Sequence, residues 1–138
     1  MHELAGTRLP AGTFTLTAQT RRRFADAVLG DPEADPSVDA LWIFTSGMPG
    51  MGIDLSQVFA LVGCSMVEDG PMLGGTEFQL HRRIELDRPY RATGEIVDVE
   101  RKTGRRAGAF DLLRIRVALA DDAGEAAAAT TTYVLPVR

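Results

Sequence analysis

The sequence has very few of the residues on which disulfides, thiolate metal sites and histidine chemistry depend. Its single cysteine, Cys64, excludes an internal disulfide and any metal site built from cysteines alone. Its histidines are His2 and His81, so a mechanism that needs an imidazole would use His81 or a histidine of another chain. Lys102 is the only lysine. The accompanying bias toward arginine and alanine is what GC-rich coding produces, and we assign it no function.

Long apolar runs and a basic surface are missing as well. No stretch approaches the ~18 to 20 apolar residues that a membrane-spanning helix requires. No basic leader with an apolar stretch and a cleavage site is visible, so export is not expected. The formal net charge of −4 argues against binding to a nucleic-acid backbone. We therefore expect a soluble, cytoplasmic protein that binds neither nucleic acid nor membrane.

The length and composition fit one domain over residues 1–138. Hydrophobic residues make up 45 % of the chain and charged residues 25 %, a balance typical of a folded domain rather than a disordered one. Periodicity predicts a helix over 18–29 that Gly30 ends, followed by a loop over 30–39. A turn is expected over 68–75. The expected strands are 13–17, 41–44, 76–87, 95–101, 110–119 and 126–135, of which the last three should form an antiparallel meander.

The most informative segment is a turn of small residues followed by an apolar stretch. Residues 46–52 contain three glycines and a proline, and residues 53–66 predict a helix of roughly four turns. Nearly every position after Gln57 is apolar, and a helix that is apolar on almost all sides must be enclosed by the rest of the domain. A curved antiparallel sheet wrapped around a central apolar helix is the α+β architecture called the hot-dog fold.

Two motifs resemble the MaoC-like and FAS1-like acyl-thioester dehydratases, a hot-dog family. The run Arg23-Phe24-Ala25-Asp26-Ala27, ending in Gly30-Asp31-Pro32, is similar to the helix and loop that open those proteins. The run Arg88-Pro89-Tyr90-Arg91-Ala92-Thr93-Gly94-Glu95 is similar to the turn that enters their third strand. The resemblance covers roughly residues 15–137. It implies a homodimer or a heterodimer with another hot-dog subunit, and a ligand that is a thioester of CoA or of acyl carrier protein, with no other cofactor and no metal.

The resemblance also locates a catalytic pair, of which one member is missing. In that family an aspartate and a histidine after the first helix orient water and exchange protons with it. Asp31 stands where the aspartate belongs, whereas Pro36 stands where the histidine belongs. Without the imidazole, the pair lacks a group that titrates near neutral pH. Asp31 is therefore either half of a catalytic pair or a turn residue after the helix.

The turn before the apolar helix is a second element that the resemblance implies. In hot-dog enzymes the thioester carbonyl points to the N-terminus of the central helix, where backbone N–H groups stabilise an oxyanion. The alternative, which is compatible, is that the glycines form a tight turn and Asp54 caps the helix. The predicted substrate-binding residues here are Gly50, Met51, Gly52 and Ser56, and the candidate catalytic residues are Asp54 and Gln57.

Other residues have two interpretations each. Arg82 breaks the apolar alternation of its strand, so either a bulge turns it outward or it meets an acid, a subunit interface or a ligand phosphate. We include it among the substrate-binding candidates. His81 is expected to be solvated or at an interface rather than catalytic, and Cys64 to be inert packing. The pair Arg105-Arg106 is a solvated loop or a contact for a CoA phosphate.

Three functions are compatible with the sequence. The first is a MaoC-like subunit that binds an acyl thioester, lacks the catalytic pair and forms a 3-hydroxyacyl/enoyl-thioester dehydratase (hydratase) with a catalytic partner chain. The second is a self-sufficient hot-dog acyl-CoA thioesterase that uses Asp54 and Gln57. The third is a non-catalytic small-molecule binder, or a pathway-specific enzyme, with an NTF2-like cone fold. The sequence does not decide whether this chain is itself an enzyme, because Pro36 replaces the expected histidine.

Overall fold

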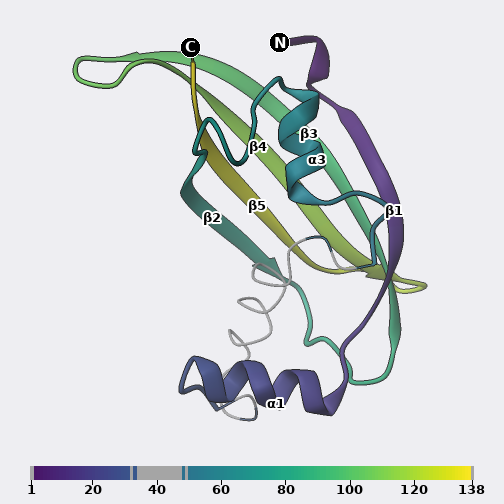
Figure 1. Ribbon diagram of the computed structural model, residues 1–138. Helices are drawn as coiled ribbons and strands as arrows, with labels where there is room; N and C mark the ends of the chain where they lie inside the picture. The colour runs from purple at the N-terminus through teal and green to yellow at the C-terminus, as the bar shows by residue number, and fades with distance from the viewer. Residues whose placement is uncertain (1, 32, 34–47, 49, 138) are drawn as a thin grey trace.

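The computed structural model describes residues 2–31, 33, 48 and 50–137 (Figure 1). The predicted strand over 41–44 and the position of Pro36 lie outside the described residues. The elements are η1 (His2–Leu4), β1 (Thr7–Thr15), α1 (Ala18–Ala27), α3 (Leu55–Leu61), β2 (Met72–Leu80), β3 (Pro89–Gly104), β4 (Gly108–Asp121) and β5 (Gly124–Pro136). In this part of the chain, neither α1 nor α3 has the length and apolar character needed to cross a bilayer.

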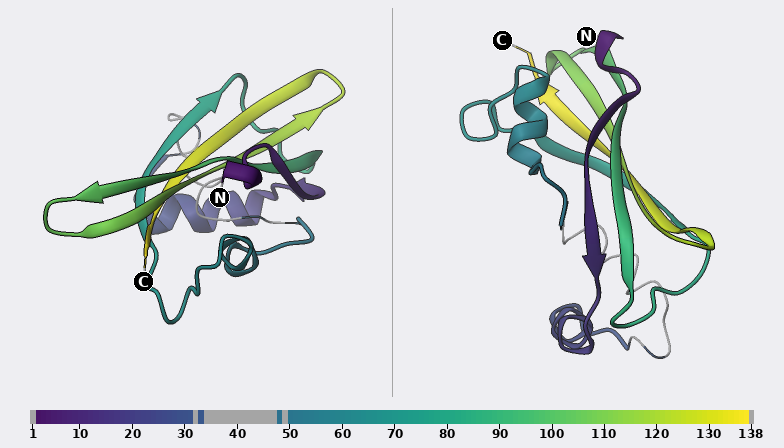
Figure 2. Two further views of the ribbon diagram at one scale, coloured as in Figure 1. Left: turned by 90° about the horizontal axis from the view of Figure 1, so that it is seen from above. Right: turned by 90° about the vertical axis from the view of Figure 1, so that its right-hand side faces the viewer.

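The described strands form one antiparallel sheet in the order β1-β3-β4-β5-β2. The predicted meander is confirmed, since β3, β4 and β5 are consecutive neighbours joined by tight hairpins. β1 pairs with β3 at one edge of the sheet, and β2 pairs with β5 at the other. The sheet is strongly curved, with α3 against its concave face near one end and α1 across the other end (Figures 1 and 2).

Alternation of side chains explains why β3 can be long and still cover a core. Every second residue from Tyr90 to Ile96 is buried and faces inward, with Tyr90, Ala92 and Ile96 all 0 % exposed, while the residues between them face outward. The register shifts between Ile96 and Asp98, which is the signature of a bulge. Because of that extra residue, Val99 rather than Asp98 returns to the buried side. β3 therefore runs well beyond the predicted 95–101 without exposing its apolar face.

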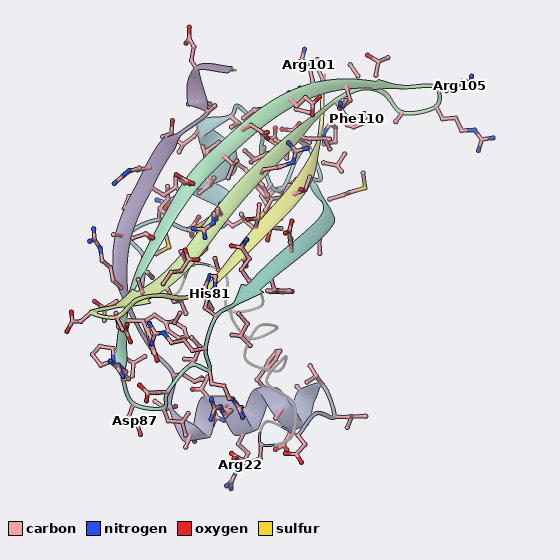
Figure 3. The ribbon with its side chains drawn as sticks, turned by 180° about the vertical axis from the view of Figure 1, so that it is seen from behind. Arg22, His81, Asp87, Arg101, Arg105 and Phe110 are labelled. Atoms are coloured by element: carbon pink, nitrogen blue, oxygen red, sulfur yellow. The ribbon has the colours of Figure 1, made fainter. Side chains whose placement is uncertain are left out.

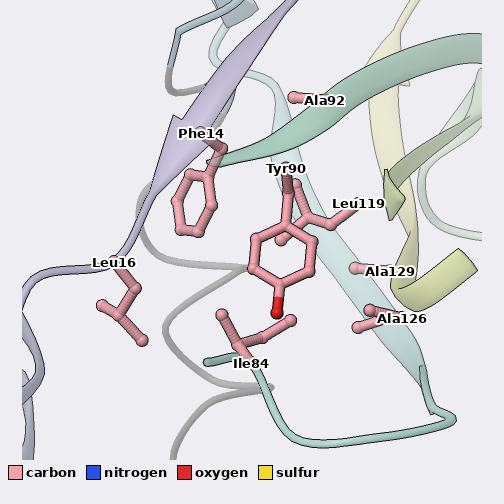
Figure 4. Packing of buried hydrophobic residues seen from close by; sticks show 9 residues of the cluster. Phe14, Leu16, Ile84, Tyr90, Ala92, Leu119, Ala126 and Ala129 are labelled. Carbon is pink, nitrogen blue, oxygen red and sulfur yellow. The ribbon is translucent and has the colours of Figure 1, made fainter. Parts of the chain in front are cut away.

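The core consists of two clusters on the concave face. The first lies at the α1 end, where the ring of Tyr90 fills the space between strands and connection (Figure 4). Its members are Phe14, Leu16, Ile84, Tyr90, Ala92, Leu119, Ala126, Ala127 and Ala129. The second lies under α3 and comprises Leu9, Val58, Phe59, Cys64, Ile96, Val99, Leu113, Ile115 and Leu135. Met51 packs against both clusters and so links them.

The α3 helix is shorter and less enclosed than predicted. It spans Leu55–Leu61 instead of 53–66, because Val62 caps it and Gly63 turns the chain with a φ of +74°. Val58 and Phe59 are buried against the sheet, but Leu61 is 49 % exposed and Val67 is 93 % exposed. The prediction that the rest of the domain encloses this segment on all sides is wrong, since one open sheet can cover only one side of a two-turn helix.

The predicted strand over 76–87 is also wrong beyond Leu80. β2 begins earlier, at Met72, within the predicted turn, and ends at Leu80. The N–H groups of His81 and Arg82 both donate to the carbonyl of Ala126, at 2.9 and 3.3 Å, and the regular ladder stops there. The following connection, residues 81–88, closes over the first cluster through Ile84 and reverses at Asp87, which has a φ of +60°.

Candidate functional site

The start of α3 is fixed by a reciprocal capping box. Asp54 Oδ1 accepts a hydrogen bond from the Gln57 N–H, and Gln57 Oε1 accepts one from the Asp54 N–H, both at 2.8 Å. A helix start leaves its first N–H groups without intrahelical acceptors, and this arrangement satisfies two of them. The predicted capping role of Asp54 is confirmed. Both candidate catalytic side chains are thus bound to backbone, while Ser56 beside them is exposed.

The glycine turn before α3 packs directly on the backbone of β1. A Cβ on Gly12 would lie 1.4 Å from the Gly50 carbonyl oxygen, and a Cβ on Gly50 would lie 1.9 Å from the Thr13 carbonyl oxygen. β1 makes room for the turn with a register irregularity between Leu9 and Gly12. These glycines therefore serve close backbone approach. Sequence reasoning missed Gly12, because no local pattern indicates a contact with a residue so far along the chain.

Met51 occupies the space between turn and sheet. Its side chain contacts both core clusters, and its Cε would lie 2.8 Å from a Cβ on Gly94. Gly52 lies against Pro10, whose Cβ would be 3.3 Å from an added Cβ. Of the predicted substrate-binding residues, Gly50, Met51, Gly52 and Ser56 are thus brought together at one place. Met51 is there as packing between the clusters, whereas Gly50, Gly52 and Ser56 are exposed.

Asp31 follows α1 and shares a hollow with α1 residues, and α1 lies across the end of the sheet opposite to α3 (Figure 1). Asp31 Oδ1 accepts a hydrogen bond of 3.0 Å from the Glu33 N–H, which is an Asx turn and matches the interpretation of Asp31 as a turn residue. Asp31 also borders a hollow of about 350 Å³ whose wall includes Arg21, Arg22 and Leu86. The carboxylate of Asp31 and the capping box of α3 therefore do not form one site within this chain.

Arg82 forms an ion pair with a buried carboxylate. Its guanidinium donates to both oxygens of Asp121, at 2.9 and 2.6 Å, and to the Gly124 carbonyl at 2.9 Å. Arg88 adds a second contact to Asp121 at 3.1 Å and also pairs with Glu85. The hydrogen bond from Arg82 is the main cause that lowers the pKa of Asp121 from 3.8 to about 2. The expectation that Arg82 meets an acid is confirmed, and this clamp ties the 81–88 connection to the β4–β5 turn.

The remaining predicted residues occupy ordinary structural positions. His81 is half exposed, and its Nε2 lies 2.9 Å from Glu125 Oε2. Cys64 is 6 % exposed within the second cluster, as expected for packing. Arg105 and Arg106 are exposed in the β3–β4 turn, and Arg105 extends from its tip (Figure 3). Among the described residues no group of His, Cys, Asp or Glu is arranged to hold a metal ion.

An apolar surface is exposed beside α3, and it includes Leu61 and Met66, which the sequence prediction placed in the enclosed helix. Five apolar residues between the end of α3 and the start of β2 are 41 to 93 % exposed: Leu61, Met66, Val67, Met72 and Leu73. We call this the α3–β2 apolar surface. Among the described strands β2 is an edge strand that pairs with β5 alone, so its outer backbone groups face away from that sheet. Single exposed apolar residues are common, but a run of them along an open edge marks an interaction site.

Comparison with known proteins gives no match to a family model and no match among curated sequences. Solved structures do match over nearly the whole chain. The HadBC complex from Mycobacterium tuberculosis, a 3R-hydroxyacyl-ACP dehydratase, aligns with a TM-score of 0.58 at 22 % identity, covering 95 % of this chain and 96 % of that one. The fold that this chain shares with that structure is the hot-dog fold.

Two further hot-dog structures agree. The ChsH1–ChsH2 complex from Mycobacterium tuberculosis has a TM-score of 0.54 at 14 % identity and covers 95 % of this chain and 97 % of that one. A MaoC-like dehydratase from Rhodospirillum rubrum has a TM-score of 0.53 at 13 % identity, with 97 % and 93 % covered. The predicted fold class is confirmed, and the alternative NTF2-like cone is not the architecture of this chain.

Proposed function

We propose that this hot-dog chain is the acyl-thioester-binding subunit of a dehydratase or hydratase, and that a second, catalytic hot-dog chain completes the enzyme. The reaction adds water across the double bond of an enoyl thioester: the hydroxyl joins the β-carbon and a proton joins the α-carbon, or the reverse occurs. Addition of water and its removal both need an acid and a base within hydrogen-bond distance of the substrate. The similar solved structures HadBC and ChsH1–ChsH2 are complexes of two named hot-dog components, which supports this assignment.

The observation that carries the proposal is the α3–β2 apolar surface on an open sheet edge. A strand from a partner would satisfy the outer backbone groups of β2, and its apolar side chains would cover Met72 and Leu73, which are 57 and 54 % exposed. Val67, 93 % exposed, would be buried by the same partner. Such a partner would lie against the C-terminal end of α3, the helix whose first turn carries the capping box.

The polar residues of this chain favour a binding role over a complete catalytic one. Asp54 and Gln57 are engaged in capping, Asp31 forms an Asx turn, and His81 contacts Glu125 at 2.9 Å. Within the described residues, none of these pairs a carboxylate with an imidazole beside the helix start. In this proposal the first-turn N–H groups of α3 orient the thioester carbonyl, and the partner supplies the acid–base pair.

The proposal is tested with crotonyl-CoA and the corresponding acyl-carrier-protein thioester. Calorimetry should detect binding of at least one thioester to the purified chain, while loss of the enoyl absorbance should occur only after co-expression with a hot-dog chain encoded nearby in the genome. Hydration by the chain alone, abolished by Asp31→Asn, would show that this chain is itself catalytic and would overturn the proposal that a partner supplies the acid–base pair. Release of free CoA that Asp54→Asn abolishes would instead indicate a thioesterase, and an absence of thioester binding would refute the proposal.

A further inference from the structure

The outer face of the sheet, opposite α3, carries a hollow bordered by three arginines. The hollow has a volume of about 290 Å³ and lies where β1, β3 and β4 run side by side. Arg8 is in register with Glu95, which is in turn in register with Arg116. Because Tyr90, Ala92 and Ile96 point to the core, the alternating residues of β3 point to this side. The full wall is Arg8, Leu9, Ala11, Arg91, Thr93, Gly94, Glu95, Arg116 and Ala118.

The charges around this hollow are not balanced. Of the arginines on the sheet and its connections, Arg82, Arg88, Arg101 and Arg114 each have a carboxylate oxygen within 3.1 Å. In the described part of the chain, no carboxylate lies within salt-bridge distance of Arg8 or Arg91. Both arginines are exposed, and Glu95 is the only acid in the wall of the hollow. Since the whole chain has a net charge of −4, this surplus of positive charge is local.

The third arginine of the hollow, Arg116, is held in place by side chains of β2 and β5. Arg116 Nη2 donates to Glu125 Oε1 at 2.6 Å and contacts Gln79 Oε1 at 3.4 Å. This fixes the guanidinium as one wall of the hollow before any ligand arrives, which reduces the entropy lost on binding. The floor consists of small side chains, including Ala118, which is only 7 % exposed, and Thr93, whose hydroxyl is a further donor. A compact anion can therefore approach the backbone of β3 and β4 closely.

We propose that Arg8, Arg91, Thr93 and Arg116 form a binding site for a diphosphate group on the outer face of the sheet. Guanidinium groups donate in a planar fork that matches two phosphate oxygens, and separate forks on β1, β3 and β4 suit an anion with two phosphoryl centres. A diphosphate occurs both in free nucleotides and in CoA, so the chemistry of the site does not depend on the function proposed above. The hollow lies on the face of the sheet away from α3, and the two sites are separate.

The test measures inorganic pyrophosphate binding by calorimetry at low ionic strength. The double variant Arg8→Gln/Arg91→Gln should weaken the affinity at least about tenfold, as expected for lost charge-assisted hydrogen bonds. Arg105→Gln/Arg106→Gln removes the same charge from an exposed turn and should change it less than about twofold. Glu95→Gln removes the only acid of the wall and should tighten binding, a gain that misfolding cannot produce.

The same variants identify the source of the diphosphate. ADP that binds with the Arg8 and Arg91 dependence assigns the site to free nucleotides. CoA that binds at least about tenfold more tightly than ADP, with that dependence, assigns it to the thioester carrier. No pyrophosphate binding at millimolar concentration, or equal losses in the Arg8/Arg91 and Arg105/Arg106 variants, would overturn the proposal.

Discussion

The two ends of the concave face differ in how much of their apolar surface this chain buries by itself. At the α1 end the Arg82–Asp121 pair closes the connection, and Arg21 Nη2 bonds to the Ile84 carbonyl at 2.8 Å. The large side chains of the first cluster are enclosed there, and of the large apolar residues described at this end only Val28 and Leu29, just after α1, are exposed, by 43 and 95 %. At the α3 end the helix has only two turns and the apolar residues that follow it remain exposed. The difference teaches that most of the apolar residues at the α1 end are buried by the chain itself, whereas a run of five at the α3 end is left uncovered and is where we propose the partner binds.

The largest expected effect on the free energy of unfolding concerns the first cluster, at the α1 end. Tyr90 is 0 % exposed, and its hydroxyl accepts a 2.9 Å hydrogen bond from the Glu85 N–H (Figure 4). Tyr90→Ala should lower the free energy of unfolding by about 3 to 5 kcal/mol, because it leaves a cavity in the first cluster. Tyr90→Phe keeps the ring and should cost only about 1 kcal/mol. Urea denaturation measures both, and similar losses for the two variants would show that the hydroxyl rather than packing dominates.

The next effect concerns the contact that positions α3. Gly12→Ala would drive a methyl group into the Gly50 carbonyl, 1.4 Å away, so it should lower the free energy of unfolding by more than about 2 kcal/mol. Gly75→Ala is the matched control, because an added Cβ there meets nothing within 4 Å. That control should change the free energy of unfolding by less than about 1 kcal/mol. Equal effects of the two substitutions would contradict the close approach of turn and β1.

The sequence could predict most of the sheet, because burial of one face of an antiparallel sheet imposes a period of two on each strand. The capping role of Asp54 was also predictable, whereas the return hydrogen bond from Gln57, which completes the box, was not part of the prediction. The end of β2 could not be predicted from the sequence. It depends on the contact of Arg82 with Asp121, whose sequence separation of 39 residues no local pattern reveals.

The length of α3 was misjudged for a different physical reason. Periodicity reports that a residue is apolar but not which chain will bury it. Leu61 and Met66 extend the apolar pattern of the predicted helix, yet they are 49 and 41 % exposed in the single chain. For the candidate site, the sequence therefore located the helix start but not the glycine contact through Gly12 or the exposure of the α3–β2 apolar surface.

A smaller effect concerns the pH dependence of stability, which the Arg82–Asp121 pair introduces at the α1 end. Because Arg82 lowers the pKa of Asp121 to about 2 in the folded chain, the stabilisation is complete above the unfolded pKa of 3.8 and is lost as pH falls toward 2. Asp121→Asn should remove this part of the acid sensitivity, so its melting temperature should fall less steeply than that of the unsubstituted chain between pH 4 and pH 2. Calorimetric scans across that range measure the slopes, and parallel slopes would contradict the clamp.

The smallest effect on the folding of a single chain is expected at the open edge. Leu73 is 54 % exposed on β2, so Leu73→Lys should change the free energy of unfolding by less than about 0.5 kcal/mol while placing a charge where a partner strand would pack. Val97→Lys is the control, since Val97 is an exposed apolar residue on β3, away from that edge. Light scattering coupled to size exclusion should show assembly with another hot-dog chain, or with a second copy, lost in Leu73→Lys and kept in Val97→Lys. If both variants assemble like the unsubstituted chain, the α3–β2 apolar surface is not the interface, and the contrast between the two ends has another cause.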